Sequence, residues 1–252
     1  MGGDRHHAGR EQAGHAQEVR QVRVSPALDR SWLDLLRTQA ERFAEVVEHG
    51  DPAREVTSCP GWTLRDLTDH LGGVHQWAAH AVVEGDPSLE PAPTPAGDAI
   101  ELSAWYLLHA SALIDVLAAR PAEAPAWTLD RDNRTAGFWR RRQVHEVTMH
   151  LWDAEHALGV ARPIDPELAW DGVAEVVDVL YPRQVRLGRT TPLATAVRLT
   201  ASDLDESVVI GNGDPVDVVA PAEVLLRTLW HREAAREIDP HVVELLSGAV
   251  TP

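Results

Sequence analysis

Residues 143–153, which read Gln-Val-His-Glu-Val-Thr-Met-His-Leu-Trp-Asp, decide the fold and suggest the chemistry. They lie in the run 138–158, which has neither glycine nor proline and is rich in helix formers, so we predict one long helix. Glu146 and His150 are one turn apart on one face of that helix, and Asp153 follows on the same face. A carboxylate and an imidazole placed in this way can supply two of the protein ligands of a divalent-metal site.

The third ligand must come from another helix, and His70 is the best candidate. It lies between Leu67 and Leu71, beside the apolar side of an earlier predicted helix, where a charged imidazole would be costly. A lone histidine in such a place is more often a hydrogen-bonded core residue, and Glu146 with His150 could be an ordinary exposed pair. If the three side chains meet, two histidines and one glutamate leave a fourth position open, as in catalytic zinc sites.

The first 160 residues have the pattern of a helical bundle. Apolar residues recur at three- and four-residue steps from Leu28, and Thr63 to Asp66 has the spacing of a capping box at a second helix. The proline-rich segment 85–97 is predicted to be a loop. Four helices follow from this pattern, at about 28–49, 63–84, 98–119 and 137–158, which predicts a four-helix bundle whose facing side chains can build a metal site.

The pattern changes after Gly159. A helix is expected from Asp165 to about Leu180, followed by three β-like segments (196–200, 207–210 and 216–219), a hairpin turn at 211–214 and a last helix after Pro221. The expected fold class is therefore α+β, mainly α. We predict a disordered leader at 1–26, a metal-binding bundle at 27–160 and a small C-terminal α/β domain at 161–252.

Composition restricts the classes of partner. The formal net charge of −16 disfavours nucleic acid and anionic membranes. The sequence shows no secretory signal and no run of about 18 apolar residues, so we expect no membrane span. The single cysteine, Cys59, excludes an intramolecular disulfide and fits the cytoplasm.

Two further segments resemble a known family. Residues 57–75 read Thr-Ser-Cys-Pro-Gly-Trp-Thr-Leu-Arg-Asp-Leu-Thr-Asp-His-Leu-Gly-Gly-Val-His, and residues 141–154 include Glu-x-x-x-His-x-x-Asp. Together they resemble the mycothiol-dependent maleylpyruvate isomerases, over roughly Leu28 to Arg232. The resemblance implies a DinB-like metal-binding bundle followed by a small α/β domain.

Carried over by position, the resemblance implies His70, Glu146 and His150 as metal ligands, with Asp153 as a nearby catalytic carboxylate. The family's late active-site arginine falls on Arg232. This chain departs from the family at His231, where glycine is common, and near Ser207, where many relatives carry tryptophan.

Further residues are predicted to act around this site. Trp62 and Trp152 are predicted to wall the pocket and, with Arg142, to form the cofactor-binding set; Arg142 shares a face with Glu146 and can orient it. Cys59 is either a nucleophile near a helix N-terminus or, more commonly in such turns, a small apolar plug. His75 is expected at the surface or rim.

The implied chemistry is activation of a thiol. A free thiol has a pKa of about 8.5 and is deprotonated when it coordinates zinc. The cofactors expected are a divalent metal, with zinc first, and mycothiol. The reaction would be addition to an electrophile, for which a carboxylate is one option, in a cis-trans isomerase or an S-transferase. The alternatives are a metal-dependent hydrolase that activates water and a non-catalytic ligand-binding bundle. The chain is expected to be a monomer or a homodimer.

Overall fold

The computed structural model describes residues 32–232, 238–248, 250 and 251. The leader predicted for residues 1–26 and the first residues of the first helix lie outside this range. The described elements are α2 (Trp32–His49), α3 (Leu64–Val83), α4 (Ala99–Ala118), α5 (Ala136–Ala157), α6 (Pro166–Glu175), the π-helical turn η1 (Val176–Leu180), α7 (Tyr181–Arg186), β1 (Ala196–Ala201), β2 (Glu206–Ile210), β3 (Pro215–Ala220), α8 (Ala222–Leu229) and α9 (Pro240–Leu245).

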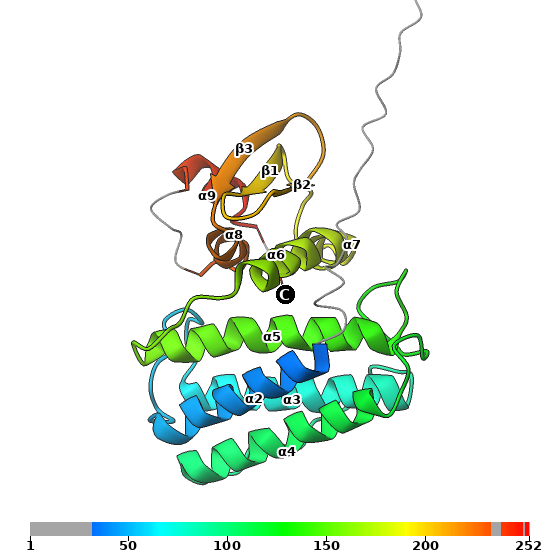
Figure 1. The fold of residues 1–252 in the computed structure, drawn as a ribbon, viewed down its shortest axis with the longest axis vertical. Coiled ribbons are helices and arrows are strands. Elements are labelled where there is room, and N and C mark those ends of the chain that lie inside the picture. The colour runs from blue at the N-terminus through cyan, green and yellow to red at the C-terminus, as the bar shows by residue number, and fades with distance from the viewer. Residues whose placement is uncertain (1–31, 233–237, 249, 252) are drawn as a thin grey trace, which may run out of the picture.

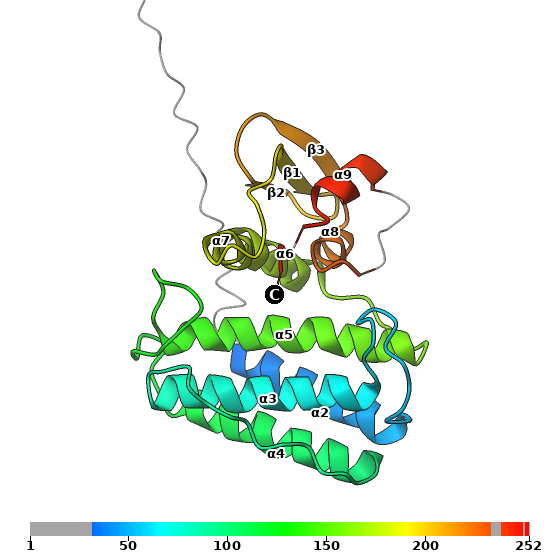
Figure 2. The same cartoon turned by 180° about the vertical axis from the view of Figure 1, so that it is seen from behind.

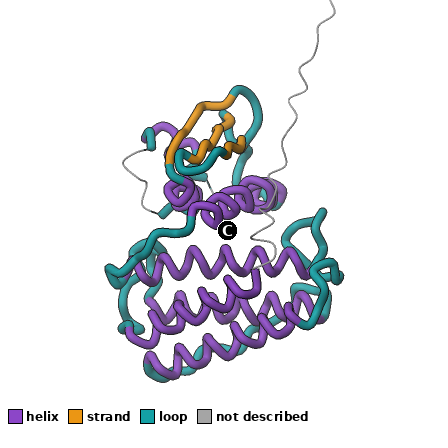
Figure 3. The backbone as a smooth tube through the Cα atoms, viewed as in Figure 1, coloured by secondary structure: helices purple, strands orange, loops and turns teal. Residues whose placement is uncertain are grey.

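The fold is mainly helical with one small sheet, as predicted from the sequence (Figure 3). Helices α2 to α5 form the four-helix bundle, and α6, α7 and α8 lie between this bundle and the small sheet, with α9 beside the sheet (Figure 1). The predicted caps are present: Thr63 and Asp66 form a capping box at α3, and Asp165 caps α6 ahead of Pro166. Helix α9 was not predicted, because six residues are too short to show a helical period.

Within the bundle, helix α5 is the one that faces the C-terminal part of the chain, so it lies between that part and the other three bundle helices (Figure 1). Eighteen of its 22 residues are buried. A helix covered on both sides needs no polar face, so the polar side chains that α5 does carry must find partners inside the protein. This explains why several side chains that could bind a metal or take part in catalysis lie on α5.

The sheet differs from the predicted arrangement. Its strand order is β2-β1-β3, with β1 antiparallel to β2 and parallel to β3. The predicted hairpin between the second and third strands is therefore wrong. Gly211 and Gly213, at φ values of 87° and 98°, turn the chain so that β3 pairs with the far edge of β1. β1 is the most buried strand, and a strand that pairs on both edges is best placed at the centre.

Helix α4 is long and apolar enough to cross a membrane by length and composition, with a mean hydropathy of 1.3 over its most apolar window. In the structure it packs against α2 and α3. Buried helices of a bundle pass the same test, so this finding is weak evidence for a membrane span.

The expectation that His75 lies at the surface or rim is wrong. Its side chain is fully buried in the bundle, with Nδ1 2.7 Å from Oε1 of Gln143 and Nε2 3.3 Å from the Tyr106 hydroxyl. Burial lowers the pKa of His75 to about 4, although the contact with Gln143 acts in the opposite direction. His75 is therefore a neutral core histidine with two polar partners.

This burial predicts acid sensitivity. The folded-state pKa of about 4 lies below that of a free histidine, about 6.5, so the unfolded chain takes up the proton first. Stability from this group is complete above pH 6.5 and is lost as the pH falls toward 4. Between pH 7.5 and 5 we expect His75 to reduce the free energy of unfolding by about 2 kcal/mol. Urea titrations of the wild type and of His75→Gln at both pH values measure this contribution of His75. If the free energy of unfolding falls equally in the variant, the prediction is contradicted.

Candidate metal centre

Helices α3 and α5 bring the three predicted metal ligands together. Nε2 of His70 lies 2.9 Å from Oε1 of Glu146, and Nε2 of His150 lies 3.6 Å from the same oxygen. The three ligand atoms lie within 4.8 Å of one another. The side chains of Glu146 and His150 are 9% and 6% exposed and that of His70 is 33% exposed, so the cluster opens on the His70 side.

The second oxygen of Glu146 is held by Arg142. This guanidinium donates one hydrogen bond to Oε2 of Glu146 and another to Glu175 of α6, and all three side chains are buried. Burial alone would raise the pKa of Glu146, but Arg142 and the hydrogen bonds with His150 and His70 hold it well below its ordinary value. Glu146 is therefore a carboxylate whose Oε1 faces the two histidines.

The other nitrogen of His150 is held by Asp153, since Nδ1 donates to Oδ2 across 2.9 Å. Burial would lower the pKa of His150, but hydrogen bonds with Asp153, Cys59 and Glu146 raise it well above 6.5. Metal-binding histidines commonly donate their second N–H to a carboxylate, which fixes the ring and leaves the other nitrogen for the metal. His150 and Asp153 have this arrangement, with Nε2 directed toward Glu146.

Arg232 reaches this cluster from the C-terminal part of the chain. Its Nε and Nη2 donate to the two oxygens of Asp153 at 2.7 and 2.8 Å. Burial raises the pKa of Asp153, but His150 and then Arg232 act against it and the net shift is downward. The guanidinium fork of Arg232 is thus engaged with a carboxylate of this chain.

A left-handed turn directs Arg232 toward α5. His231, the residue before it, has a φ of 55°, in the region that favours glycine. Its ring nitrogen Nε2 lies 2.9 Å from the carbonyl oxygen of Leu246. This conformation gives a physical reason for the glycine that the resemblance implies at this position.

Cys59 is part of the same cluster. It is 8% exposed, and its sulfur lies 3.3 Å from Oδ2 of Asp153 and 3.3 Å from Nη2 of Arg232. The thiol therefore lies between a carboxylate and a guanidinium group, which differ from the apolar surroundings of a simple plug.

The two tryptophans assigned to the pocket lie in different places. The Trp62 ring is 5.0 Å from that of His70 and 6.3 Å from that of His150, so it borders the cluster. Trp152 instead stacks on His156 at 4.6 Å, and the Arg227 guanidinium lies 5.0 Å from its ring centre. Residue 152 is two positions from His150 on the helix, which turns it to the opposite face.

Sequence reasoning missed Trp230 and Glu175. Trp230 is buried, with its ring 6.3 Å from that of His150 and with the guanidinium carbons of Arg142 and Arg232 at 5.6 and 5.9 Å from its ring centre. One signal for Glu175 was present: it is an acid in an apolar part of the predicted helix and would need a buried cation.

A second ionic contact joins the same helices. Asp171, one turn before Glu175 on α6, accepts from Arg141 and from His145 of α5, each at 2.6 Å. Burial raises the pKa of Asp171, but His145 and Arg141 lower it below its ordinary value overall. Two buried links, a turn apart, therefore fix α6 to α5.

The residues present fit a divalent metal. Two imidazole nitrogens and one carboxylate oxygen converge, and the remaining polar atoms of Glu146 and His150 are already bonded to Arg142 and Asp153. Nitrogen and oxygen ligands of this kind suit zinc and other first-row divalent metals.

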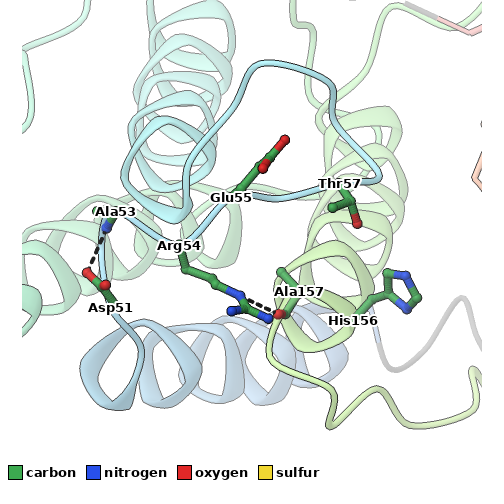
Figure 4. Close-up of a pocket in the computed structure, with 7 residues that line it drawn as sticks. All are labelled: Asp51, Ala53, Arg54, Glu55, Thr57, His156 and Ala157. Atoms are coloured by element: carbon green, nitrogen blue, oxygen red, sulfur yellow. Dashed lines mark hydrogen bonds between the residues drawn. The ribbon is translucent and has the colours of Figure 1, made fainter.

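A separate hollow of about 550 Å³ lies at one end of α5 (Figure 4). It is lined by the segment 51–57 and by His156 and Ala157, and the Arg54 side chain crosses it to donate to the Ala157 carbonyl at 2.8 Å. The three ligand candidates are not part of its lining, and its walls carry charges of both signs.

Comparisons with known proteins agree with this architecture. Crystal structures of the mycothiol-dependent maleylpyruvate isomerase and of a histidine-to-alanine mutant of it superpose with TM-scores of 0.60 and 0.62 at 16% and 15% identity. Each superposition covers 84% of this chain and 95% of that structure, which establishes the fold.

Two uncharacterized proteins from Mycobacterium tuberculosis, of strains CDC 1551 and H37Rv, are each 27% identical over 131 residues. The match covers 50% of this chain and 66% of each relative, so the chain spans just under two thirds of their length. Residues 33–155 match the family model described as the mycothiol maleylpyruvate isomerase N-terminal domain. The model covers just under half of the chain, so the chain contains a region similar to this domain.

Proposed function

We propose that this protein is a metal-dependent cytoplasmic enzyme that uses mycothiol as a thiol nucleophile toward an electrophilic double bond. The reaction is a cis-trans isomerisation of the maleylpyruvate type or an S-transfer. The observation that carries the proposal is the convergence of His70, Glu146 and His150 within 4.8 Å, in a chain that is similar in fold to the mycothiol-dependent maleylpyruvate isomerase and in residues 33–155 to the N-terminal domain of that name. The proposed ligands are these three residues, and zinc is the proposed metal.

A zinc ion bound there would hold a coordinated thiol as its thiolate at neutral pH. The protein's own part is to keep the three ligand atoms in place. Arg142 fixes the carboxylate of Glu146, Asp153 fixes the ring of His150, and Trp62 packs beside both histidine rings. Partners of this kind around a metal typically change metal affinity or activity 10- to 100-fold, that is by about one to two orders of magnitude.

The charges around the centre favour one bound anion. Three buried carboxylates (Glu146, Asp153 and Glu175) face two guanidinium groups (Arg142 and Arg232), which leaves one negative charge when the histidines are neutral. A divalent cation would reverse this to one positive charge, and a single thiolate would then neutralise the site. Uncompensated charge is costly in a buried site, so this balance supports a monoanionic ligand.

The open side of the centre lies at His70, the most exposed of the three ligands. Electrophile and thiol would both approach from this side, because Glu146 and His150 are covered by α6 and Trp230. The aromatic and helical cover excludes bulk water from the far side of the site.

Arg232 has two candidate roles that one experiment separates. From the resemblance it would bind a substrate carboxylate with its planar fork, but in the structure that fork holds Asp153. Arg232→Lys keeps the charge and loses the fork, so we expect kcat/KM to fall by about 10- to 100-fold with metal content unchanged. A loss confined to acidic electrophiles supports carboxylate binding, whereas an equal loss on neutral ones indicates action through Asp153. Full activity contradicts both roles.

The function itself is tested by incubating the metal-loaded protein with mycothiol and a panel of electrophiles, and by following isomers and adducts by mass. Product that requires both metal and mycothiol is the expected result. Turnover without the thiol would favour the hydrolase alternative. A protein that binds no metal and turns over none of the electrophiles would favour a non-catalytic bundle.

A further inference from the structure

The segment between α3 and α4 runs back along α3 and is fastened to it (Figure 2). As the residue number rises in this segment, its partner on α3 falls. The Pro87 carbonyl accepts from Trp77, Ala92 exchanges two hydrogen bonds with Gln76, and the amide of Thr94 donates to Asp69. Four prolines stiffen this segment, residues 85–97, which we call the strap. The strap is therefore a preorganised wall and not a loose loop.

A groove of about 500 Å³ lies between the strap and α3. Its lining begins with Asp69 and His70, continues along α3 with Gly73, Val74 and Trp77, and is closed on the strap side by Leu89, Pro91, Ala92 and Pro93. Beyond Asp69 and His70 every side chain in this lining is apolar, apart from the Trp77 N–H, which is bonded to Pro87.

His70 belongs to both the groove and the candidate metal centre. It is also the ligand at the open side of that centre. From His70 to Trp77 the helix rises about 10 Å, enough for an elongated organic group to lie along it. A molecule that reacts at the centre can thus extend past His70 into the groove without leaving the protein surface.

We infer that this groove binds the apolar, non-reacting part of the electrophile, so that the preferred substrates are α,β-unsaturated carbonyl compounds with a hydrocarbon or aromatic extension. This inference rests on the proposed function and adds the substrate class to it. The electrophile is favoured over the thiol because the groove side chains beyond His70 are apolar, whereas mycothiol is a polyol conjugate that needs polar partners. Gly73 has a special place in the groove, since its bare Cα leaves space beside Pro91.

The test uses a series of straight-chain enones of increasing length with mycothiol and the metal-loaded enzyme. Each further methylene that enters the groove should raise kcat/KM about fourfold, until the groove is full. Gly73→Leu fills the space beside Pro91 and should reduce the ratio of long-chain to short-chain kcat/KM to nearly one. Gly73→Ala is the milder variant; its added methyl would meet the Pro91 ring at 3.8 Å, an ordinary contact, and should lower the ratio only in part.

Ala104→Leu is the control, because it also ends in a leucine, adding three carbons where Gly73→Leu adds four, at an exposed position of α4 outside the groove lining. It should keep the wild-type ratio. The inference is overturned if Gly73→Leu keeps the wild-type ratio of long-chain to short-chain kcat/KM. It is also overturned if Gly73→Leu raises the KM for mycothiol equally with all enones, since the groove would then hold the thiol.

Binding of the corresponding saturated ketones, measured by calorimetry, tests the groove without any turnover. Affinity that increases with chain length in the wild type and not in Gly73→Leu supports the groove even if no enone reacts. In that case the proposed reaction fails while the binding site stands. Affinity independent of chain length in the wild type contradicts the groove, whatever the activity.

Discussion

Replacing His150 by alanine is expected to reduce the bound divalent metal from about one per chain to nearly none. His150 is one of the three proposed ligands, and its ring is held by Asp153 so that Nε2 faces Glu146. Loss of one ligand from a three-residue site leaves two donors, which do not compete well with water and buffer. Elemental analysis of the purified variants measures the loss directly.

Two controls make this result specific. His156→Ala removes another imidazole from α5, one that stacks on Trp152 and lies outside the ligand cluster, and it should keep the metal. A chelator should lower the stability of the wild type by about 3 kcal/mol where the free metal is at hundredfold its dissociation constant, and should not affect His150→Ala. Metal retained in His70→Ala, Glu146→Ala and His150→Ala alike would contradict the assignment.

The convergence of His70, Glu146 and His150 could be predicted because its geometry is mostly local. Glu146 and His150 are four residues apart on one helix, and helical spacing alone places them on one face. His70 needed a further argument, that a histidine beside an apolar stripe must have a buried partner. The helical angle of His75 predicts a place at the surface or rim, and this is wrong, because a neutral histidine can satisfy both nitrogens with Gln143 and Tyr106 inside the core.

The sheet and the links between the helices could not be predicted in the same way. The glycines near Gly211 indicate a turn, but they do not decide whether the next strand pairs with its neighbour or crosses to the far edge of β1. Likewise nothing near Arg142 in the sequence identifies Glu175 as its partner, since the two meet only when α6 packs on α5. Contacts between distant segments depend on packing, and packing is not visible in a local pattern.

These packing contacts also position a candidate metal ligand, Glu146. Arg142 lies between Glu146 and Glu175, so a residue of α6 acts on a candidate ligand of α5 through one guanidinium group. Packing of α6 against α5 and the orientation of Glu146 are therefore linked. An enzyme built in this way would hold its metal most tightly when its two parts are correctly packed.

Glu175→Gln is expected to lower metal affinity by about 10- to 100-fold, although Glu175 touches no metal ligand atom among the three. The variant keeps the size of the side chain and removes one negative charge, so Arg142 is left with Glu146 as its charged partner. Arg142 then neutralises Glu146 more completely and makes it a weaker ligand. Metal affinity is measured by competition with a chromophoric chelator, and the free energy of unfolding by urea titration of the metal-free protein.

Asp171→Asn is the matched control, because it breaks the neighbouring link to Arg141 and His145. It does not change the contacts of Arg142 with Glu146 and Glu175. Removing one partner of a buried ion pair costs about 3 kcal/mol or more, so both variants should destabilise the metal-free protein to a similar extent. Only Glu175→Gln should also weaken metal binding. An equal loss of affinity in both variants would mean that loosening the contact between α5 and α6 is sufficient, and an unchanged affinity in Glu175→Gln would mean that Glu146 is positioned without help from α6. Either result would contradict the specific path from Glu175 through Arg142 to Glu146.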